Sequence, residues 1–507
     1  MKKLSSNIVG GILLCAASAS SDAAFLYNVH AGGNDAQLLQ STDVGASRFK
    51  PVGKLWTSLQ CTATLISGTE TPDKDLPALI LTAGHCVDNN MGTNRVIVGQ
   101  PVLQNWEFIP DYFIDKKEEL HPVKVNKVVY ATMKQYDLAV LQLDATYGDM
   151  ANKGILPMKL QRSPSPQKQP IELAHIPIDG VDMEHRYIRH SACNITDKTS
   201  ALYEGIFPWL WEPAYSMDCT GVVGGSSGSP VVLNEQANII GIVNTTVTPG
   251  YNGCGLGRPC EIVGNHSSIR EGASYFIPVN RIIDALTSDG ILDTTKLDNG
   301  AGNIFNRRGT WISQSKIGGK AATWDINLDE KVDYIRFKVG LANDTDCADP
   351  DGYGSAETAV DQPLLNLPLP EKEGIYKLCA ISKSRDAGWL PVEHAAFTLH
   401  EIDDTPPEEK PTIRVSENEA NWIIELEATP YEIESLQIKY GPRDEIQCDD
   451  KTGYRLYFGI PVLLPKAESP WRVCTYGQDI AMNNGPTSQR DITPGKSAKA
   501  SVSSADM

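Results

Sequence analysis

The sequence predicts an all-β fold, on the evidence of two patterns. Between residues 50 and 290, short runs of β-branched and other apolar residues, such as 62–66, 128–140 and 239–243, are separated by Gly, Pro, Asn and Asp. Runs of this kind with turn residues between them are typical of β-barrels and β-sandwiches. Beyond residue 300, two stretches of about 100 residues resemble one another, and each combines strand-like alternation with one pair of cysteines.

The composition excludes several classes of function. The 507 residues include 63 acidic and 45 basic side chains, so the formal net charge is −18. Such a charge argues against polyanionic partners, namely nucleic acids and anionic membrane surfaces. Hydrophobic residues make up 41% and charged residues 21%, which is typical of a packed globular chain. After the N-terminus no apolar run approaches the ~20 residues that a transmembrane helix requires, so no transmembrane segment is expected.

The segment 1–23 has the features of a cleaved signal peptide. Two lysines precede an apolar segment rich in small residues at 8–19, and motifs ending at Ala19 and Ala23 are of the kind that signal peptidase cleaves. A short buried helix or an uncleaved anchor is the alternative. Cleavage removes Cys15, one of 11 cysteines, and leaves ten to form five disulfides. We therefore expect a secreted or periplasmic protein.

One helix is expected at the end of the first region, which we place at 24–297. Asn280 can cap this helix and Gly290 can end it. Its apolar stripe consists of Ile282, Ile283 and Leu286. A polar linker at 298–303 follows the helix and leads into the C-terminal region.

The C-terminal region contains an internal repeat. The strand-like segment 335–340 matches 436–441, 101 positions later, and at the same offset Cys347 falls on Cys448. Further matches follow in the same order, with small gaps, and two tryptophans upstream open equivalent strands. These matched pairs are Gly352 with Gly453, Tyr353 with Tyr454, Cys379 with Cys474, and Trp324 with Trp422.

The repeat predicts two small β-sandwiches, at 304–402 and 411–484, similar to immunoglobulin-like modules. Each is stapled by its own cysteine pair, Cys347–Cys379 in the first and Cys448–Cys474 in the second. An acidic, proline-rich segment between them is expected to be a semi-stiff spacer, and 485–507 is expected to be a disordered tail.

Three short strings carry the functional argument. They are the segments 81–86, 136–141 and 225–230. In chain order they contain His85, Asp137 and Ser227, and they resemble the triad strings of the chymotrypsin/trypsin-like serine peptidases. The resemblance covers roughly residues 50–290 and implies a two-barrel domain with a C-terminal helix that cleaves proteins.

The chemistry requires these residue types. A serine hydroxyl is a poor nucleophile until a base takes its proton, and a neighbouring acid fixes the tautomer of the histidine base. The resemblance assigns these roles to Ser227, His85 and Asp137, and assigns the oxyanion hole to the N–H groups of Gly225 and Ser227. Each string also has an ordinary interpretation: a structural histidine, an acid at the start of a strand, a flexible Gly-Ser loop. Their joint occurrence in this order favours the triad.

The resemblance further implies a disulfide between Cys61 and Cys86, which holds the histidine loop. Four other cysteines of this region allow three pairings. They are Cys193, Cys219, Cys254 and Cys260. Proximity favours Cys193–Cys219 with Cys254–Cys260, and Cys219–Cys254 beside the substrate pocket is the rival.

The sequence departs from the family at the residue before the nucleophile. Trypsin-like zymogens carry an acid there, which pairs with a newly cut N-terminus, whereas this chain has Ser226. The string resembles glutamyl-endopeptidase-like and HtrA-like members, so we expect activity once the signal peptide is removed, or after a cut whose effect is only to unblock the site. The substrate pocket is assigned to Gly221 at its base, with Asn244 and Thr246 on one wall. No acid at the base means no evident preference for Arg or Lys before the cleaved bond.

These patterns predict a secreted serine endopeptidase that takes protein or peptide substrates, with C-terminal modules that bind substrate or a surface, or that aid stability. The alternatives are a non-catalytic adhesin on a peptidase scaffold and an acyl hydrolase that does not cleave peptides. No cofactor is expected, and no Cys/His cluster has zinc spacing. The acidic stretch 344–351 is expected to be a solvated loop, with weak Ca²⁺ binding as the other interpretation.

Overall fold

The computed structural model describes most of the chain after the N-terminal segment. The described ranges are 33–163, 168–199, 201–205, 207–233, 237–248, 254–305, 311–328, 332–355, 357–358, 367–383, 388–428 and 433–493. The expected signal peptide with Cys15, and residues 494–507 of the expected tail, lie outside them. Within these ranges, no helix is both long enough and apolar enough to span a bilayer.

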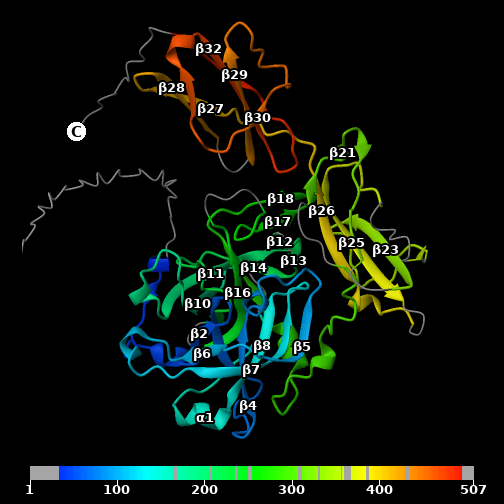
Figure 1. Ribbon diagram of the computed structural model, residues 1–507. Coiled ribbons are helices and arrows are strands. Elements are labelled where there is room, and N and C mark those ends of the chain that lie inside the picture. Colours follow the sequence, from blue (N-terminus) through cyan, green and yellow to red (C-terminus); the bar gives the residue numbers. More distant parts are fainter. Residues whose placement is uncertain are drawn as a thin grey trace, which may run out of the picture.

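The first of two closed β-barrels is built from residues 52–159 (Figure 1). Six strands follow in the order β2-β6-β7-β8-β4-β3, and β3 pairs back with β2 to close the ring. With β5 and β9, which extend the sheet, their bounds are β2 Val52–Trp56, β3 Gln60–Ser67, β4 Pro77–Thr82, β5 Val96–Pro101, β6 Glu107–Pro110, β7 Val123–Thr132, β8 Leu138–Thr146 and β9 Met158–Lys159. Leu55, Leu65 and Leu141 are fully buried in its core.

The second barrel closes in the same way, in the order β11-β10-β15-β16-β19-β14 with β14 paired to β11. The short strand β1 adds to its edge. The bounds are β1 Gln37–Leu38, β10 Pro170–His175, β11 Arg189–Thr199, β14 Ala214–Met217, β15 Pro230–Leu233, β16 Asn238–Thr246 and β19 Ser274–Pro278. Two six-stranded barrels with few helices agree with the all-β, two-barrel expectation.

The helices differ in detail from the expectation. Helix α1 (Tyr147–Asn152) begins with a capping box between Thr146 and Asp149. Val279 occupies the N-cap position of helix α2 (Asn280–Ala285), so Asn280 is the first residue of the helix and not its cap. The side chain of Asn280 instead accepts a hydrogen bond from the backbone N–H of Ser163 (3.0 Å). The helix ends at Ala285, with Leu286 at the C-cap position. Gly290 is not part of the helix end; it belongs to a separate turn, in which its N–H donates to the carbonyl of Thr287.

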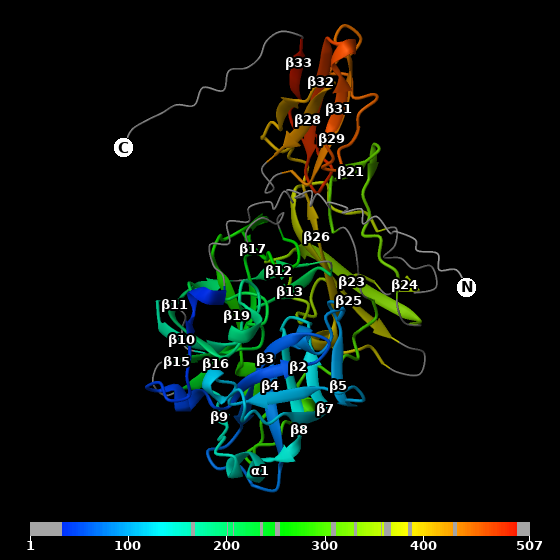
Figure 2. The ribbon, with the colours of Figure 1, turned by 60° about the vertical axis from the view of Figure 1, so that its left-hand side comes forward.

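A separate four-stranded sheet, in the order β13-β12-β17-β18, lies between the second barrel and the first repeat (Figure 2). Its strands are β12 Leu202–Glu204, β13 Trp209–Trp211, β17 Cys260–Val263 and β18 His266–Ser268. They come from two loops of the second barrel, one between β11 and β14 and the other between β16 and β19. The disulfide Cys254–Cys260 holds the second of these loops.

The first repeat forms a five-stranded sheet in the order β20-β26-β25-β23-β24. Its strands are β20 Ile312–Ser313, β23 Tyr334–Leu341, β24 Glu357–Thr358, β25 Gly374–Lys383 and β26 Ala396–Ile402, beside the hairpin β21 Lys316–Ile317 and β22 Lys320–Ala321. Trp324, expected to open a strand, lies fully buried outside the named strands.

The second repeat has two sheets, β27-β28-β31 and β30-β29-β32-β33. The strands are β27 Thr412–Glu417, β28 Asn421–Glu427, β29 Ser435–Pro442, β30 Arg455–Leu456, β31 Val462–Pro465, β32 Trp471–Gln478 and β33 Ser488–Ile492. Their shared core includes Ile424, Ile438 and Val473. The disordered tail was predicted to begin at residue 485, which is too early, because residues 488–492 form β33 and pair with β32. The immunoglobulin-like assignment stays a prediction.

The two repeats share their local geometry. Lys338 lies opposite Cys379 in the first, and Lys439 lies opposite Cys474 in the second. Each lysine ammonium donates to backbone carbonyls of the acidic loop that follows its strand. In the first loop, Asp346 accepts from a local backbone N–H. The acidic stretch thus has a lysine ammonium bound to its carbonyl groups.

All five disulfides are present in the structure. They are Cys61–Cys86, Cys193–Cys219, Cys254–Cys260, Cys347–Cys379 and Cys448–Cys474. In the first region this is the pairing favoured by proximity, and Cys219–Cys254 is not formed.

The first repeat packs directly on the four-stranded sheet. The indole N–H of Trp311 donates to the carbonyl of Gly205 (2.9 Å), and the hydroxyl of Tyr203 donates to the carboxylate of Glu401 (2.7 Å). A single apolar cluster joins the two parts; it includes Tyr203, Leu210, Ile262, Trp311, Ile375 and Phe397. The sheet therefore has the first repeat on one side, and this arrangement fixes the position of β12 and β13.

Candidate active site

His85 and Asp137 form a hydrogen-bonded pair between two elements of the first barrel. His85 lies in the 3-10 turn η3 (Gly84–Cys86), and Asp137 immediately precedes β8. The ring Nδ1 of His85 lies 2.6 Å from Asp137 Oδ2, and the backbone N–H of His85 donates to Oδ1 (2.9 Å). Since a carboxylate only accepts, Nδ1 carries the proton, which leaves Nε2 as the basic nitrogen.

Asn244 of β16 is the third group on this carboxylate. Its Nδ2 donates to Asp137 Oδ2 (2.6 Å). Asp137 is fully buried, so three donors from two barrels compensate the loss of water around its charge. Sequence reasoning placed Asn244 in the substrate pocket; the structure shows that its amide also holds Asp137.

The pKa of His85 reflects two opposing effects. Burial lowers the pKa, while the charge of Asp137 and its hydrogen bond raise it, with a smaller contribution from Glu204. The net pKa lies above the ordinary value of 6.5. A histidine tuned in this way accepts a proton readily near neutral pH, as a general base requires.

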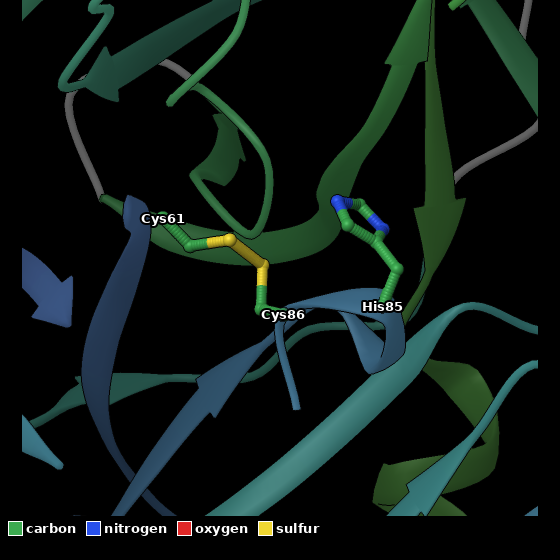
Figure 3. A group of neighbouring side chains, drawn as sticks. All are labelled: Cys61, His85 and Cys86. Carbon is green, nitrogen blue, oxygen red and sulfur yellow. A yellow bond between two sulfur atoms is a disulfide. The ribbon is translucent and has the colours of Figure 1, made fainter. Parts of the chain in front are cut away.

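The disulfide Cys61–Cys86 holds the histidine turn against β3 (Figure 3). In Figure 3 the imidazole of His85 lies beside the disulfide. These three residues also bring potential metal ligands within 4.8 Å of one another. Because both sulfur atoms are in the disulfide, neither is a thiolate, and the group does not have the chemistry of a zinc site.

Ser227 lies in a tight loop between β14 and β15 that only glycine-containing sequences can form. Gly225 has φ 93° and Gly228 has φ 79°. A Cβ at Gly225 would lie 2.6 Å from the carbonyl oxygen of Ile176, and a Cβ at Gly228 would lie 2.2 Å from the hydroxyl of Thr82. Both positions therefore exclude side chains for two reasons, backbone conformation and space.

The first barrel also holds this loop in place. The hydroxyl of Thr62, in β3, donates to the carbonyl of Gly225 (2.9 Å), and the N–H of Thr62 donates to the carbonyl of Ser227 (2.9 Å). The N–H groups of Ser226 and Gly228 donate to carbonyl oxygens of Val223 and Val243. Within the described residues, the N–H groups of Gly225 and Ser227 have no acceptor. The two donors assigned to the oxyanion hole are thus left available.

Ser226, the residue that replaces the family's acid, is fully buried and bonds to a histidine. Its hydroxyl lies 2.9 Å from Nδ1 of His175, and His175 Nε2 lies 3.0 Å from the hydroxyl of Ser191. That hydroxyl donates to the carbonyl of Thr220 (2.8 Å). Burial, followed by the nearby charges of Arg189 and His190, lowers the pKa of His175 to about 3, so the ring is neutral. Sequence reasoning did not identify His175.

His85 and Ser227 line one cleft. Its other described residues include Met133, Asp179, Glu204, Trp209, Trp211, Val222, Gly224, Asn244, Thr245 and Thr246. The hydroxyl of Thr246 lies 3.1 Å from that of Ser274, at hydrogen-bond distance. Gly221 does not line the cleft: it turns away with φ 75°, and a Cβ there would lie 2.7 Å from Ala36. The N-terminal segment thus occupies the space beside Gly221.

Residues 61–242 match the family model described as a trypsin-like peptidase domain. This segment is a trypsin-like peptidase domain. The match includes most of both barrels, the paired His85 and Asp137, and the loop of Ser227. The peptidase domain is thus assigned from the chain's own residues, and the repeats lie outside it.

Three solved structures of proteases each match a little under half of the chain. A thermostable serine protease, AL20, from an extremophilic microorganism has 16% identity over 46% of this chain and 92% of its own, with a TM-score of 0.30. A Glu endopeptidase in complex with MPD has 15% identity over 47% and 89%, with a TM-score of 0.27. Protease Anisep from Arthrobacter nicotinovorans has 13% identity over 45% and 90%, with a TM-score of 0.30. A search of curated proteins found no match.

Proposed function

We propose that the chain is a secreted serine endopeptidase in which Ser227, His85 and Asp137 act as a catalytic triad. The observation that carries the proposal is the 2.6 Å contact of His85 Nδ1 with Asp137 Oδ2, in a cleft that Ser227 also lines. An imidazole held by a buried carboxylate, with a serine on the same cleft, is the arrangement that acyl transfer to serine requires.

In the proposed reaction, Nε2 of His85 takes the proton of the Ser227 hydroxyl as Oγ bonds to the carbonyl carbon of the substrate. The negative charge that develops on the carbonyl oxygen is stabilised by the N–H groups of Gly225 and Ser227. His85 then gives the proton to the leaving amine, the C–N bond breaks, and an acyl-enzyme remains. His85 then removes a proton from a water molecule, which attacks the ester carbonyl; the bond to Ser227 Oγ breaks, His85 returns the proton to Oγ, and the acid is released.

Export is part of the proposal. The predicted signal peptide and five disulfides support an oxidising compartment outside the cytoplasm. We propose that the first repeat stabilises the peptidase domain, since its apolar core is continuous with the four-stranded sheet. Binding of substrate or a surface component is proposed only for the second repeat.

Labelling with a fluorophosphonate tests the proposal. We expect the full chain, purified after export and without further cutting, to label once per molecule and to cleave casein. Ser227→Ala must lose both signals, while the control Ser67→Ala, a buried serine of β3, must keep the label. Absence of label on folded wild-type protein would favour the binding-protein alternative. Ester turnover without peptide cleavage would favour an acyl hydrolase, and labelling only after clipping would contradict direct activity.

A further inference from the structure

Two adjacent side chains of strand β12 point to opposite faces of the four-stranded sheet. Successive residues of a strand point to opposite faces. Tyr203 faces the first repeat, where its hydroxyl donates to Glu401 (2.7 Å). Glu204 faces the other way and lines the cleft that contains His85 and Ser227. The packing of the repeat on Tyr203 therefore fixes the position of Glu204.

The carboxylate of Glu204 is buried and only partly satisfied. The side chain is 3% exposed. Its Oε1 accepts the backbone N–H of Gly257 (2.5 Å), and within the described residues Oε2 has no hydrogen-bond partner. Burial raises the pKa of this carboxyl to about 7, although Thr245, Gly257 and the charge of His85 lower it. A buried carboxyl oxygen without a partner costs stability, and a ligand that engages this oxygen would offset that cost.

The surroundings of Glu204 favour a positively charged ligand. Two described residues of the cleft carry carboxylates, Glu204 and the exposed Asp179, and none is Lys or Arg. Trp209 and Trp211 stand beside Glu204 with nearly parallel rings, 6.1 Å apart and inclined by 20°. An indole face and a carboxylate together suit the aliphatic stem and the charged end of Lys or Arg.

We propose that Glu204, Trp209 and Trp211 form a subsite for a basic side chain of the substrate. The proposal rests on the serine-peptidase function above. It follows from the shared cleft, because Glu204 and both tryptophans line the same cleft as His85 and Ser227.

Cleavage of a random decapeptide library by the full-length wild-type protein tests the subsite. We expect Lys or Arg to be enriched at one position near the cut, and at least about 10-fold higher kcat/KM for a peptide with Lys at that position than for its norleucine analogue. Glu204→Gln should bring this ratio near 1. The control Glu118→Gln, which removes an exposed carboxylate outside the cleft, should keep the ratio.

Equilibrium binding separates the subsite from catalysis. Ser227→Ala protein should bind the Lys peptide at least about 10-fold more tightly than the norleucine peptide, and Ser227→Ala/Glu204→Gln should not discriminate. Equal affinities for the first protein would overturn the subsite even where wild-type protein labels with fluorophosphonate. Conversely, discrimination without labelling would sustain the subsite and overturn the proposed catalysis.

A pH series on wild-type protein covers the case in which Glu204→Gln does not fold. The Lys/norleucine ratio of kcat/KM should rise between pH 6 and pH 8 as Glu204 ionises. His85 and Asp137, the charged groups that act on Glu204, affect both peptides alike, so their contributions cancel in the ratio. A ratio that does not change over this range would contradict the role of Glu204.

Discussion

His175 Nδ1 lies 2.9 Å from the hydroxyl oxygen of Ser226, directly beneath the loop that carries Ser227. Because the hydroxyl of Ser191 donates to the carbonyl of Thr220, it accepts from Nε2–H of His175, and Nδ1 accepts from Ser226. A neutral chain of hydrogen bonds thus occupies the place where trypsin-like zymogens use an acid. We infer that no new N-terminus is needed to hold the loop.

Ser226→Ala tests this chain. The change leaves a buried acceptor on His175 without its donor, so we expect a loss of about 1–3 kcal/mol in unfolding free energy. Fluorophosphonate labelling should slow by more than the loss of folded protein explains, because the N–H groups of Gly225 and Ser227 are less well fixed. Denaturant unfolding and labelling rates measure the two effects. Ser67→Ala is the control, and normal labelling by Ser226→Ala would contradict the role.

The pKa of His175 predicts sensitivity to acid. Its folded pKa is about 3, against 6.5 ordinarily, so below pH 6.5 the unfolded chain takes up a proton that the folded chain does not. This contribution to stability is complete above pH 6.5 and falls by up to about 1.4 kcal/mol per pH unit toward pH 3. His175→Gln should flatten the pH dependence of the unfolding free energy between pH 6 and pH 4. An unchanged slope would show that the ring is not buried neutral.

Asn244→Ala should weaken catalysis without unfolding the chain. Hydrogen bonds to charged groups contribute about 1.5–3 kcal/mol, which corresponds to a fall in kcat/KM of about 10- to 160-fold. The pH–rate profile should shift with it, because Asn244 donates to the carboxylate that holds His85. Asn238→Ala, at the other end of β16, is the matched control. Equal effects of the two changes would indicate only a general effect on the strand.

Truncation distinguishes the two repeats. A chain ending at residue 303 loses Trp311 and Phe397 from the cluster that covers Tyr203, so we expect aggregation and loss of labelling. A chain ending at residue 410 keeps this cluster nearly complete and should still label. Soluble yield and fluorophosphonate labelling measure the difference. Full labelling of the shorter chain would contradict a structural role of the first repeat.

The barrels, the repeat and the three strings were predictable because each is a local pattern. Strand-length apolar runs between turns indicate β structure wherever the partners lie, and the glycines around Ser227 mark a loop that no other residue can form. The two repeats, which are offset by 101 positions, have the same strand register in the structure: Lys338 and Lys439 each lie opposite a cysteine. The prediction that Asn280 caps its helix was wrong because its side chain accepts a hydrogen bond from the N–H of Ser163, 117 positions away.

Only the tertiary structure decided which residues assist the triad. Nothing in the local sequence distinguishes His175 or Glu204 from an ordinary strand residue. Gly221 was expected to line the cleft, but in the structure it lies against Ala36 of the N-terminal segment. The sequence by itself determined the type of fold and the residues that carry chemistry, because periodicity and backbone constraints act over a few neighbours. Burial, charge and pairing depend on segments that lie far apart in the chain, so the partners of Asp137, Ser226 and Glu204 emerge only when the barrels and the first repeat pack together.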